Sequence, residues 1–202
     1  MSCGQAQHDT DTPNSVSILE LRQQHYDDLM ACAGQPSKHV WLAQIIASWL
    51  IGQGALPDYL GLPVQKFQTL VQQCFPGYQV SGTAVSAQKA DFSRMLEKQD
   101  LEQYLRRFAQ EQSEFSECLI GMIVAACLGS DHLWQDLGLW SRKDLSAMLC
   151  HYFPQMKELN SKDMKWKKFL YKQLCETEGF YVCRAPSCEV CKDYQDCFGQ
   201  ED

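Results

Sequence analysis

The stretch Cys118-Leu119-Ile120-Gly121-Met122-Ile123-Val124-Ala125-Ala126-Cys127-Leu128 is the longest unbroken run of apolar and small residues in the chain. Its 11 residues are too few for a membrane-spanning helix, which needs roughly 20. We therefore predict a helix that is buried in the core of a globular protein. No segment alternates apolar and polar residues over a useful length, so we expect an all-α fold with little or no sheet.

Apolar residues recur at helical spacing on both sides of this run. The clearest stripes are Ile18, Leu21, His25 and Leu29; Phe67, Leu70, Val71 and Cys74; and Leu101, Tyr104, Leu105 and Phe108. A hydrophobic content of 45% is that of a folded chain. We predict a single helical body over residues 17–175, preceded by a mobile polar tail over residues 1–16 and followed by a cysteine-rich segment over residues 176–202.

The chain contains a weak internal repeat. When it is shifted by 77 positions, residues 52–62 align with residues 129–139, and each segment carries a Leu-Gly-Leu sequence, at 60–62 and at 137–139. After one inserted residue the next helices align as well, so that residues 67–76 match residues 145–154. Two repeated helix–turn–helix units would bury their apolar stripes against each other in one body. A coincidental match between two amphipathic helix pairs is the alternative.

Charge and composition exclude several functions. The 202 residues include 25 acidic and 18 basic side chains, for a net charge of −7. General nucleic-acid-binding proteins have the opposite excess, so we do not expect nucleic acid as a partner. The first 30 residues contain five acidic residues and no apolar run long enough for a signal peptide. We therefore expect a cytoplasmic protein with no membrane partner.

The 11 cysteines fall into two groups. Seven are scattered, and we expect them to be thiols of the helical core. The other four, Cys183, Cys188, Cys191 and Cys197, form a C-x4-C-x2-C-x5-C pattern within 15 residues. The residues between these four are charged, polar or Pro, so burial in a core does not explain the pattern. Four thiolates close together are typical of a metal centre.

The spacing of these four cysteines favours an iron–sulfur cluster. Structural zinc sites usually take two distant pairs of ligands, whereas C-x4-C-x2-C recurs in iron–sulfur proteins. A structural zinc site remains the alternative, because spacing alone does not name the metal.

A basic segment precedes the cysteines. Residues 157–172 carry six Lys and two acidic residues. We predict a helix here that starts at the cap pair Asn160 and Asp163. Its lysine stripe, which consists of Lys165, Lys168 and Lys172, lies on a different face from Trp166, Leu170 and Leu174. The stripe is either a solvated helix face or a surface that attracts an oxyanion or an acidic partner.

His132 is a further candidate site residue. It lies in Ser130-Asp131-His132-Leu133-Trp134, where a helix is expected to end. A histidine in this place caps a helix, packs, or ligates a metal through a neutral imidazole. Capping or packing is the commoner use.

Three of these segments resemble the NifQ family of nitrogen-fixation proteins. They are the C-x4-C-x2-C-x5-C pattern, the sequence His132-Leu133-Trp134-Gln135-Asp136-Leu137-Gly138-Leu139, and the sequence Met164-Lys165-Trp166-Lys167-Lys168-Phe169. The resemblance implies that Cys183, Cys188, Cys191 and Cys197 bind an iron–sulfur cluster able to include molybdenum.

The resemblance also implies a function and partners. Such a protein supplies molybdenum for the iron–molybdenum cofactor of nitrogenase, receives molybdate or molybdenum from a supplier, and passes the metal to a cofactor-assembly scaffold and its associated reductase. A lysine stripe near the cysteines would raise the local concentration of molybdate, which is a dianion.

Two other functions are compatible with a four-cysteine loop. One is a structural zinc module that mediates protein contacts. The other is an iron–sulfur DNA repair glycosylase, but the acidity of the chain disfavours it. The sequence has no evident nucleophile–base pair, phosphate-binding loop or paired carboxylates, so we expect a carrier and not an enzyme.

Overall fold

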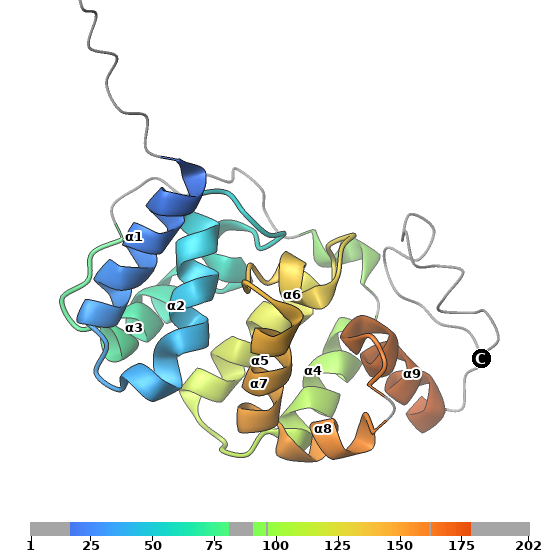
Figure 1. Ribbon diagram of the computed structural model, residues 1–202. Coiled ribbons are helices and arrows are strands. Elements are labelled where there is room, and N and C mark those ends of the chain that lie inside the picture. The colour runs from blue at the N-terminus through green and yellow to red at the C-terminus, as the bar shows by residue number, and fades with distance from the viewer. Residues whose placement is uncertain (1–16, 81–90, 96, 162, 179–202) are drawn as a thin grey trace, which may run out of the picture.

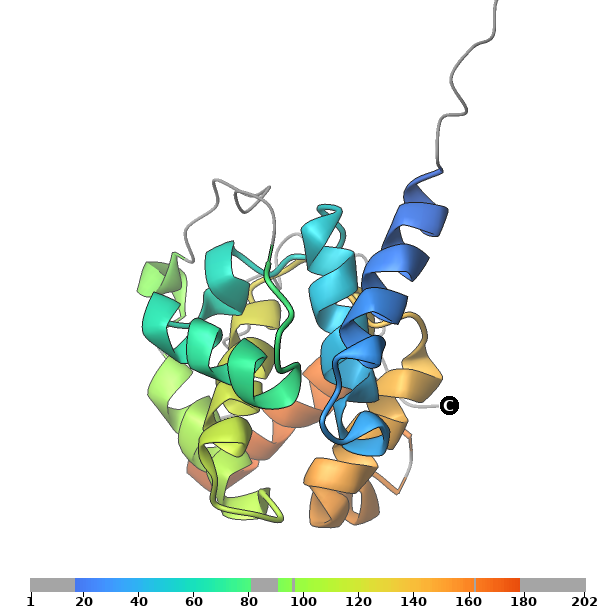
Figure 2. The same cartoon turned by 90° about the vertical axis from the view of Figure 1, so that its left-hand side faces the viewer.

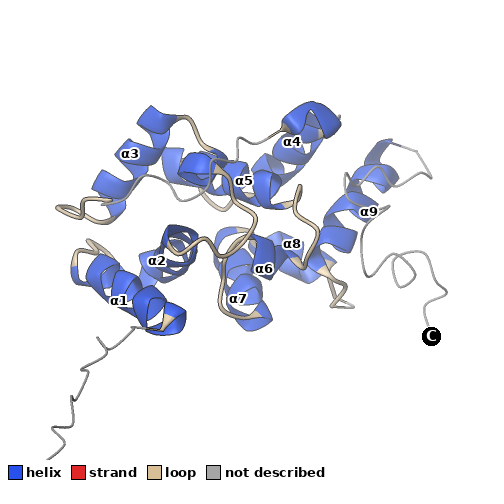
Figure 3. Ribbon diagram, turned by 90° about the horizontal axis from the view of Figure 1, so that it is seen from above, coloured by secondary structure: helices blue, strands red, loops and turns tan. Residues whose placement is uncertain are grey.

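The computed structural model describes residues 17–80, 91–95, 97–161 and 163–178. Within these ranges the regular structure is entirely helical (Figure 1; Figure 3), as the apolar spacing predicts. The α-helices are α1 Ile18–Ala31, α2 Pro36–Leu50, α3 Val64–Cys74, α4 Lys98–Phe108, α5 Glu114–Ala126, α6 Leu133–Asp136, α7 Arg142–Tyr152, α8 Pro154–Leu159 and α9 Trp166–Glu178. The short 3-10 helices η1 Asp58–Gly61 and η2 Phe92–Arg94 lie between them. The predicted tail over residues 1–16 and the cysteine-rich loop lie outside the described residues.

The quoted apolar run forms most of α5, as predicted. Ser113 caps the start of the helix, because its hydroxyl accepts a hydrogen bond from the Ser116 backbone N–H. Ile120, Met122 and Ile123 are at most 1% exposed. In Figure 3, α5 lies between α3 and α4, and it contacts both of them. None of the described helices is long and apolar enough to cross a membrane.

Helix α1 lies at the opposite end of the molecule from α9 (Figure 1). A capping box holds its start, because the Ser17 hydroxyl accepts from the Glu20 N–H and the Glu20 carboxylate accepts from the Ser17 N–H. Leu29 is fully buried, but Ile18 is 63% exposed, and the first turns of α1 extend beyond the neighbouring helices in Figure 2. The predicted stripe of α1 is therefore buried only toward the C-terminal end of the helix.

The two halves of the helical body share one order of elements. A shift of 78 positions places α3 on α7 with the same first and last residues, and a shift of 77 places the last residue of α1 on the last residue of α4. α1 packs on α2, and the corresponding helix α4 packs on α5. Both Phe75 and Phe153 are fully buried and end their helices with similar backbone angles. The repeat therefore includes the helix before each Leu-Gly-Leu sequence as well as the helix after it.

The Leu-Gly-Leu glycines form reciprocal contacts between the two halves. Gly61 and Gly138 both have a φ of +78°. A Cβ atom at Gly61 would lie 2.8 Å from the Ala125 Cβ, and one at Gly138 would lie 2.9 Å from the Ser48 Cβ. Ser48 and Ala125 are themselves 77 positions apart. Such exchanged contacts are typical of a two-fold arrangement, in which the same surface on each half meets its copy.

The two halves differ in the short helix at the Leu-Gly-Leu turn, and, among the described residues, only the second half continues into further helices. Tyr59 and Leu60 of η1 have positive φ values, whereas the corresponding α6 is right-handed. After Phe153, Pro154 starts α8, and the chain then turns into α9. The last of these additions, α9, meets α6 and α7 at the candidate site.

Candidate functional site

The four predicted cluster ligands, Cys183, Cys188, Cys191 and Cys197, lie outside the described residues, so their role stays a prediction. α9 ends at Glu178, five positions before Cys183. The described part of the chain has no group of three or more His, Cys, Asp or Glu side chains placed to hold a metal ion.

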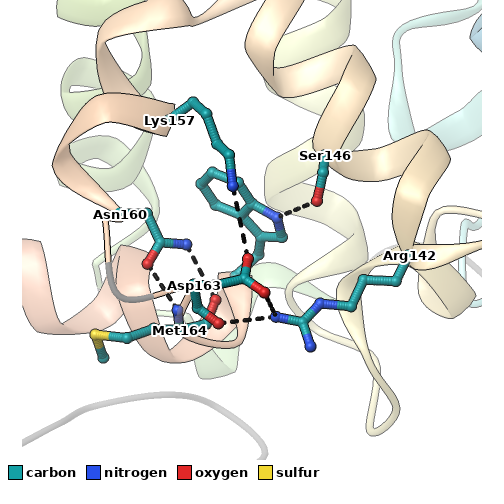
Figure 4. Close-up of polar contacts among 7 residues, drawn as sticks. Arg142, Ser146, Lys157, Asn160, Asp163 and Met164 are labelled. Carbon is teal, nitrogen blue, oxygen red and sulfur yellow. Dashed lines mark hydrogen bonds and ion pairs between the residues drawn. The ribbon is translucent and has the colours of Figure 1, made fainter.

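Asn160 joins α8 to α9 by a side-chain clamp on the backbone (Figure 4). Its amide Nδ2 donates to the Met164 carbonyl at 3.0 Å, and its Oδ1 accepts from the Met164 N–H at 2.8 Å. Asn160 is 2% exposed, so both bonds are protected from water. The predicted capping role is wrong, because Asn160 follows α8 and α9 begins only at Trp166.

Asp163 is the second residue of the predicted cap pair, and it too has a different role. Its φ is +51°, and its carboxylate lies 3.1 Å from Arg142 Nη2 and 3.6 Å from Lys157 Nζ (Figure 4). Arg142 also donates to the Asp163 carbonyl at 2.8 Å. One carboxylate thus joins the loop before α9 to α7 and to α8.

The predicted packing face of α9 is confirmed. Trp166, Leu170 and Leu174 are 3%, 0% and 7% exposed. The Trp166 indole N–H donates to Ser146 Oγ at 3.4 Å (Figure 4 shows this contact at Ser146). Lys172 is exposed on the helix surface. The first turn of α9 is therefore fixed against α7 by a buried aromatic ring.

A buried ion pair joins α9 to α6. Lys167 Nζ donates to the Asp136 carboxylate and to the Gly129 carbonyl, the latter at 2.8 Å. The Asp136 side chain is 5% exposed and the Lys167 side chain is 18% exposed. Burial raises the pKa of Asp136, although Lys167 acts in the opposite direction. A Cβ atom at Gly129 would overlap the carboxyl group of Asp136, so glycine leaves the space for this pair.

Sequence reasoning missed this ion pair. Asp136 stands three residues after Leu133 and three before Leu139, and both leucines are buried. An acid on the apolar face of a helix is the signal for a buried, paired carboxylate. Its partner lies 31 positions away and is not identified by any spacing rule.

A pocket with a volume of about 180 Å³ opens beside this ion pair, between α6, α7 and the start of α9. Its apolar walls are Leu133, Trp134, Leu145 and Trp166. Its polar lining consists of Asp131, His132, Arg142, Lys165, Lys167 and Lys168. The structure thus brings His132 together with two members of the lysine stripe, Lys165 and Lys168. Lys172 does not line this pocket.

The matches to known proteins cover the segments that meet at this pocket. A family model described as NifQ matches residues 41–199. The chain is 40% identical to Protein NifQ of Azotobacter vinelandii over 189 residues, which cover 87% of this chain and 95% of that protein. The chain belongs to the NifQ family. It is also 32% identical to Protein NifQ of Klebsiella pneumoniae over 165 residues, with 78% of this chain and 96% of that protein covered.

The NifQ match includes the pocket and all four predicted cluster ligands, since both lie within residues 41–199. A third relative, Protein NifQ of Rhodobacter capsulatus, is 30% identical over 160 residues, which cover 79% of this chain and 87% of that protein. No solved structure shows a significant match to the chain. The two helical segments that carry the NifQ resemblance, residues 132–139 and 164–169, face each other across the pocket and the buried ion pair.

Proposed function

We propose that this protein is an iron–sulfur/molybdenum cluster carrier that donates molybdenum for the biosynthesis of the nitrogenase iron–molybdenum cofactor. The observation that carries the proposal is the C-x4-C-x2-C-x5-C pattern at the end of a chain that belongs to the NifQ family. Cys183, Cys188, Cys191 and Cys197 would hold the cluster. When bound, the cluster supplies soft sulfur donors of the kind that reduced molybdenum prefers.

The donor set fits such a cluster. Four thiolate ligands lie within 15 residues, which matches the ligand number of common iron–sulfur clusters. The buried ion pair and the Asn160 clamp fix α9, the helix after which the cysteine segment follows. A carrier must release the metal that it binds, so we expect the cluster to be partly exposed, unlike a closed structural site.

The proposed carrier function also defines the partners. The protein would receive molybdate or molybdenum from a supplier and deliver it, in the cytoplasm, to the cofactor-assembly scaffold and its associated reductase. It would act as a carrier and not as an enzyme, because its cargo is bound and released without chemical turnover of a separate substrate.

Anaerobic purification tests this proposal. The full chain is analysed for iron, acid-labile sulfide, molybdenum and zinc, and its absorption spectrum is recorded. We expect iron and sulfide with a coloured chromophore, and added molybdenum after loading with molybdate under reducing conditions. A colourless protein that contains only zinc would favour the structural zinc module instead.

Matched cysteine variants locate the cluster. Cys188→Ala should lose the chromophore and retain helical circular dichroism, because the described core does not include this residue. Cys150→Ala removes an exposed cysteine on α7 and should keep both. Loss of the chromophore in Cys150→Ala, or its retention in Cys188→Ala, would contradict the assigned ligands.

A further inference from the structure

We propose that a second pocket, between α3 and the start of α5, binds an aromatic side chain of a partner protein. The ring would take the place that the Trp41 side chain has in the other half of the molecule. The internal repeat indicates the ligand, because it shows what fills the equivalent space within the same fold. The proposal goes beyond the proposed function and does not depend on a metal cluster.

The pocket is of a size and composition that suit such a side chain. Its volume is about 440 Å³, and ligand pockets have volumes of about 300–1,000 Å³. Its apolar lining consists of Leu70, Phe115 and Cys118, of which Leu70 and Cys118 are buried. The other lining residues are polar and belong to α3 or to the start of α5. An apolar pocket within a polar rim is typical of a site that receives an aromatic anchor from a partner.

A tryptophan fills the equivalent place in the other half. The shift of 77 positions places Trp41 of α2 on Cys118 of α5. The shift of 78 positions places Gln73 of α3 on His151 of α7. The rings of Trp41 and His151 are in contact, with their centroids 5.6 Å apart, while Cys118 and Gln73 both line the pocket. The pocket therefore corresponds to the space that the indole occupies, and the smaller Cys118 leaves that space open.

A second contact supports this correspondence. The ring of Trp41 also lies 5.9 Å from that of Tyr152, the last residue of α7, and Tyr152 corresponds to Cys74, the last residue of α3. Burial is the main cause that raises the pKa of Cys74 to about 12, and the nearby Cys118 thiol adds to the rise. Each half thus brings the last residue of α3 or α7 close to the same position of α5 or α2.

The apolar lining suits a ring in particular. The ring of Phe115 packs on that of Tyr152, with 5.2 Å between the centroids, so it presents a fixed aromatic surface. An incoming ring would pack on it in an offset or edge-to-face arrangement. Burial raises the pKa of Cys118, so its thiol is neutral at pH 7, and sulfur makes favourable contacts with the edges of aromatic rings.

The charges at the pocket balance, which favours an uncharged side chain over an ion. The carboxylate of Glu117 accepts two hydrogen bonds from Arg106, at 2.6 and 2.7 Å. Of the remaining lining residues, Lys66 and Glu114 carry one charge of each sign. The pocket therefore has no excess charge that would select an anion or a cation.

A row of polar side chains on α3 suits the backbone that would carry the ring. Gln65, Thr69 and Gln73 are four positions apart, so they lie on one face of the helix, and all three line the pocket. Amide and hydroxyl side chains both donate and accept hydrogen bonds, as the N–H and carbonyl groups of a peptide require. This row favours an aromatic residue within a peptide chain over a free aromatic molecule.

Fluorine NMR with N-acetyl-5-fluoro-L-tryptophanamide tests the site, because this uncharged probe has a peptide-like group on each side of its Cα atom. We expect its fluorine resonance to shift and broaden saturably as the full wild-type chain is added. Unlabelled N-acetyl-L-tryptophanamide should displace the probe, whereas N-acetyl-L-leucinamide should not. Absence of saturable binding, or equal displacement by the leucine derivative, would overturn an aromatic site.

Free indole distinguishes the two sources of an aromatic ring. It lacks the peptide groups, so we expect it to displace the probe only at higher concentration than N-acetyl-L-tryptophanamide does. Displacement at the same or a lower concentration would overturn a ring that is carried by a partner chain and would assign the pocket to a free aromatic molecule.

Matched tryptophan variants locate the binding. Thr69→Trp places a bulky ring at the pocket from an exposed position of α3, and it should abolish binding of the probe. Gln72→Trp is the control, because Gln72 is exposed on the same helix but does not line the pocket, and it should bind as wild type. Retained binding in Thr69→Trp, with circular dichroism showing a folded protein, would overturn the pocket as the binding site.

The repeat also makes a reciprocal prediction. Trp41→Cys empties the equivalent place in the other half, so Thr69→Trp/Trp41→Cys should regain the binding that Thr69→Trp loses. Cys118→Trp copies the other half and should lose binding while keeping a melting temperature at or above that of the wild type. A folded double variant that does not bind, or a Cys118→Trp protein that melts at a lower temperature, would overturn the correspondence on which the choice of ligand rests.

Discussion

Asp136 places a carboxylate in the apolar core, and the folded protein accommodates this charge because Lys167 pairs with it. The charge of Asp136 loses most of its hydration on burial, and the ammonium group of Lys167 compensates for that loss at short range. Removal of one partner leaves the other buried and unpaired. The pair therefore positions α9 more than it adds net stability.

We expect Lys167→Met to lower the free energy of unfolding by about 3–5 kcal/mol, because it leaves Asp136 buried without a counter-charge. The double variant Lys167→Met/Asp136→Leu should recover a large part of this loss. Urea denaturation followed by circular dichroism measures both, with the exposed Lys143→Met as the control. A double variant no more stable than Lys167→Met would contradict this account of the pair.

The loss of stability in Lys167→Met should depend on pH, and the raised pKa of Asp136 gives the direction. Burial raises the pKa of Asp136 in the folded protein, so folding favours its protonated form. The stability that protonated Asp136 adds to the folded state is fully present below the unfolded pKa of about 3.9. It is lost as the pH rises through the raised folded pKa. Without Lys167 the folded pKa rises further. The destabilisation by Lys167→Met should therefore be smaller at about pH 5 than at about pH 7.5, and urea denaturation at both pH values checks this; an equal loss at both would contradict it.

Among the elements, the Leu-Gly-Leu turns place a tight steric demand on the contact between the two halves. Gly61 and Gly138 combine a positive φ with a close approach to the other half, whereas Gly77 has a φ of +87° and no atom within 4 Å of a built Cβ. Gly77→Ala should cost about 1 kcal/mol for the backbone conformation alone. Gly61→Ala and Gly138→Ala should cost a further ~1–3 kcal/mol, because each turn must move away from the helix of the other half that it contacts, α5 for Gly61 and α2 for Gly138. Thermal and urea denaturation of the three variants measure the difference, and equal losses would contradict a tight contact between the halves.

The helical elements were predictable because their pattern is local. Residues three and four positions apart face the same side of a helix, so Phe67, Leu70 and Val71 specify the buried face of α3 without reference to the rest of the chain. The alignment of the two Leu-Gly-Leu sequences was visible for the same reason. The reciprocal contacts of the two glycines depend on how the halves pack, and the sequence does not contain that information directly.

The site was predictable only in part. His132, Lys165 and Lys168 were identified as candidates one by one, but their shared pocket depends on contacts across more than 30 positions. The cap assigned to Asn160 and Asp163 was wrong because their side chains bond to Met164, to Arg142 and to Lys157 rather than to the start of a helix. Polar side chains have several possible partners, and packing decides among them.

Over the whole molecule, positive charge gathers where the second half departs from the first. The chain as a whole is acidic, but α8, α9 and the loop between them carry Lys157, Lys165, Lys167, Lys168 and Lys172. The first half has no counterpart of α8 and α9 among the described residues. The repeated part supplies one side of the pocket, and the added segment at the start of α9 supplies the three lysines that line its other side, Lys165, Lys167 and Lys168.

The six described cysteines should divide by burial when the whole protein is treated with a thiol reagent. Cys74, Cys118 and Cys127 are buried in the core as predicted, Cys32 and Cys175 are half-buried, and Cys150 is exposed, which contradicts a core role for it. Burial raises the pKa of Cys74 and of Cys127 to about 12. At about pH 8 such thiols are on the order of 10³-fold less ionised than an ordinary cysteine, and only the thiolate reacts.

We therefore expect iodoacetamide to label Cys150 rapidly in the native protein, and to label Cys74, Cys118 and Cys127 only after unfolding. Peptide mass spectrometry at successive times measures each site, with the urea-unfolded protein as the control for intrinsic reactivity. Labelling of Cys127 at the rate of Cys150 in the native protein would show that the α5 core opens readily. Protection of the three core thiols would instead show that this helix stays closed while the exposed thiol reacts, as expected for a rigid body that carries its reactive cysteines outside the core.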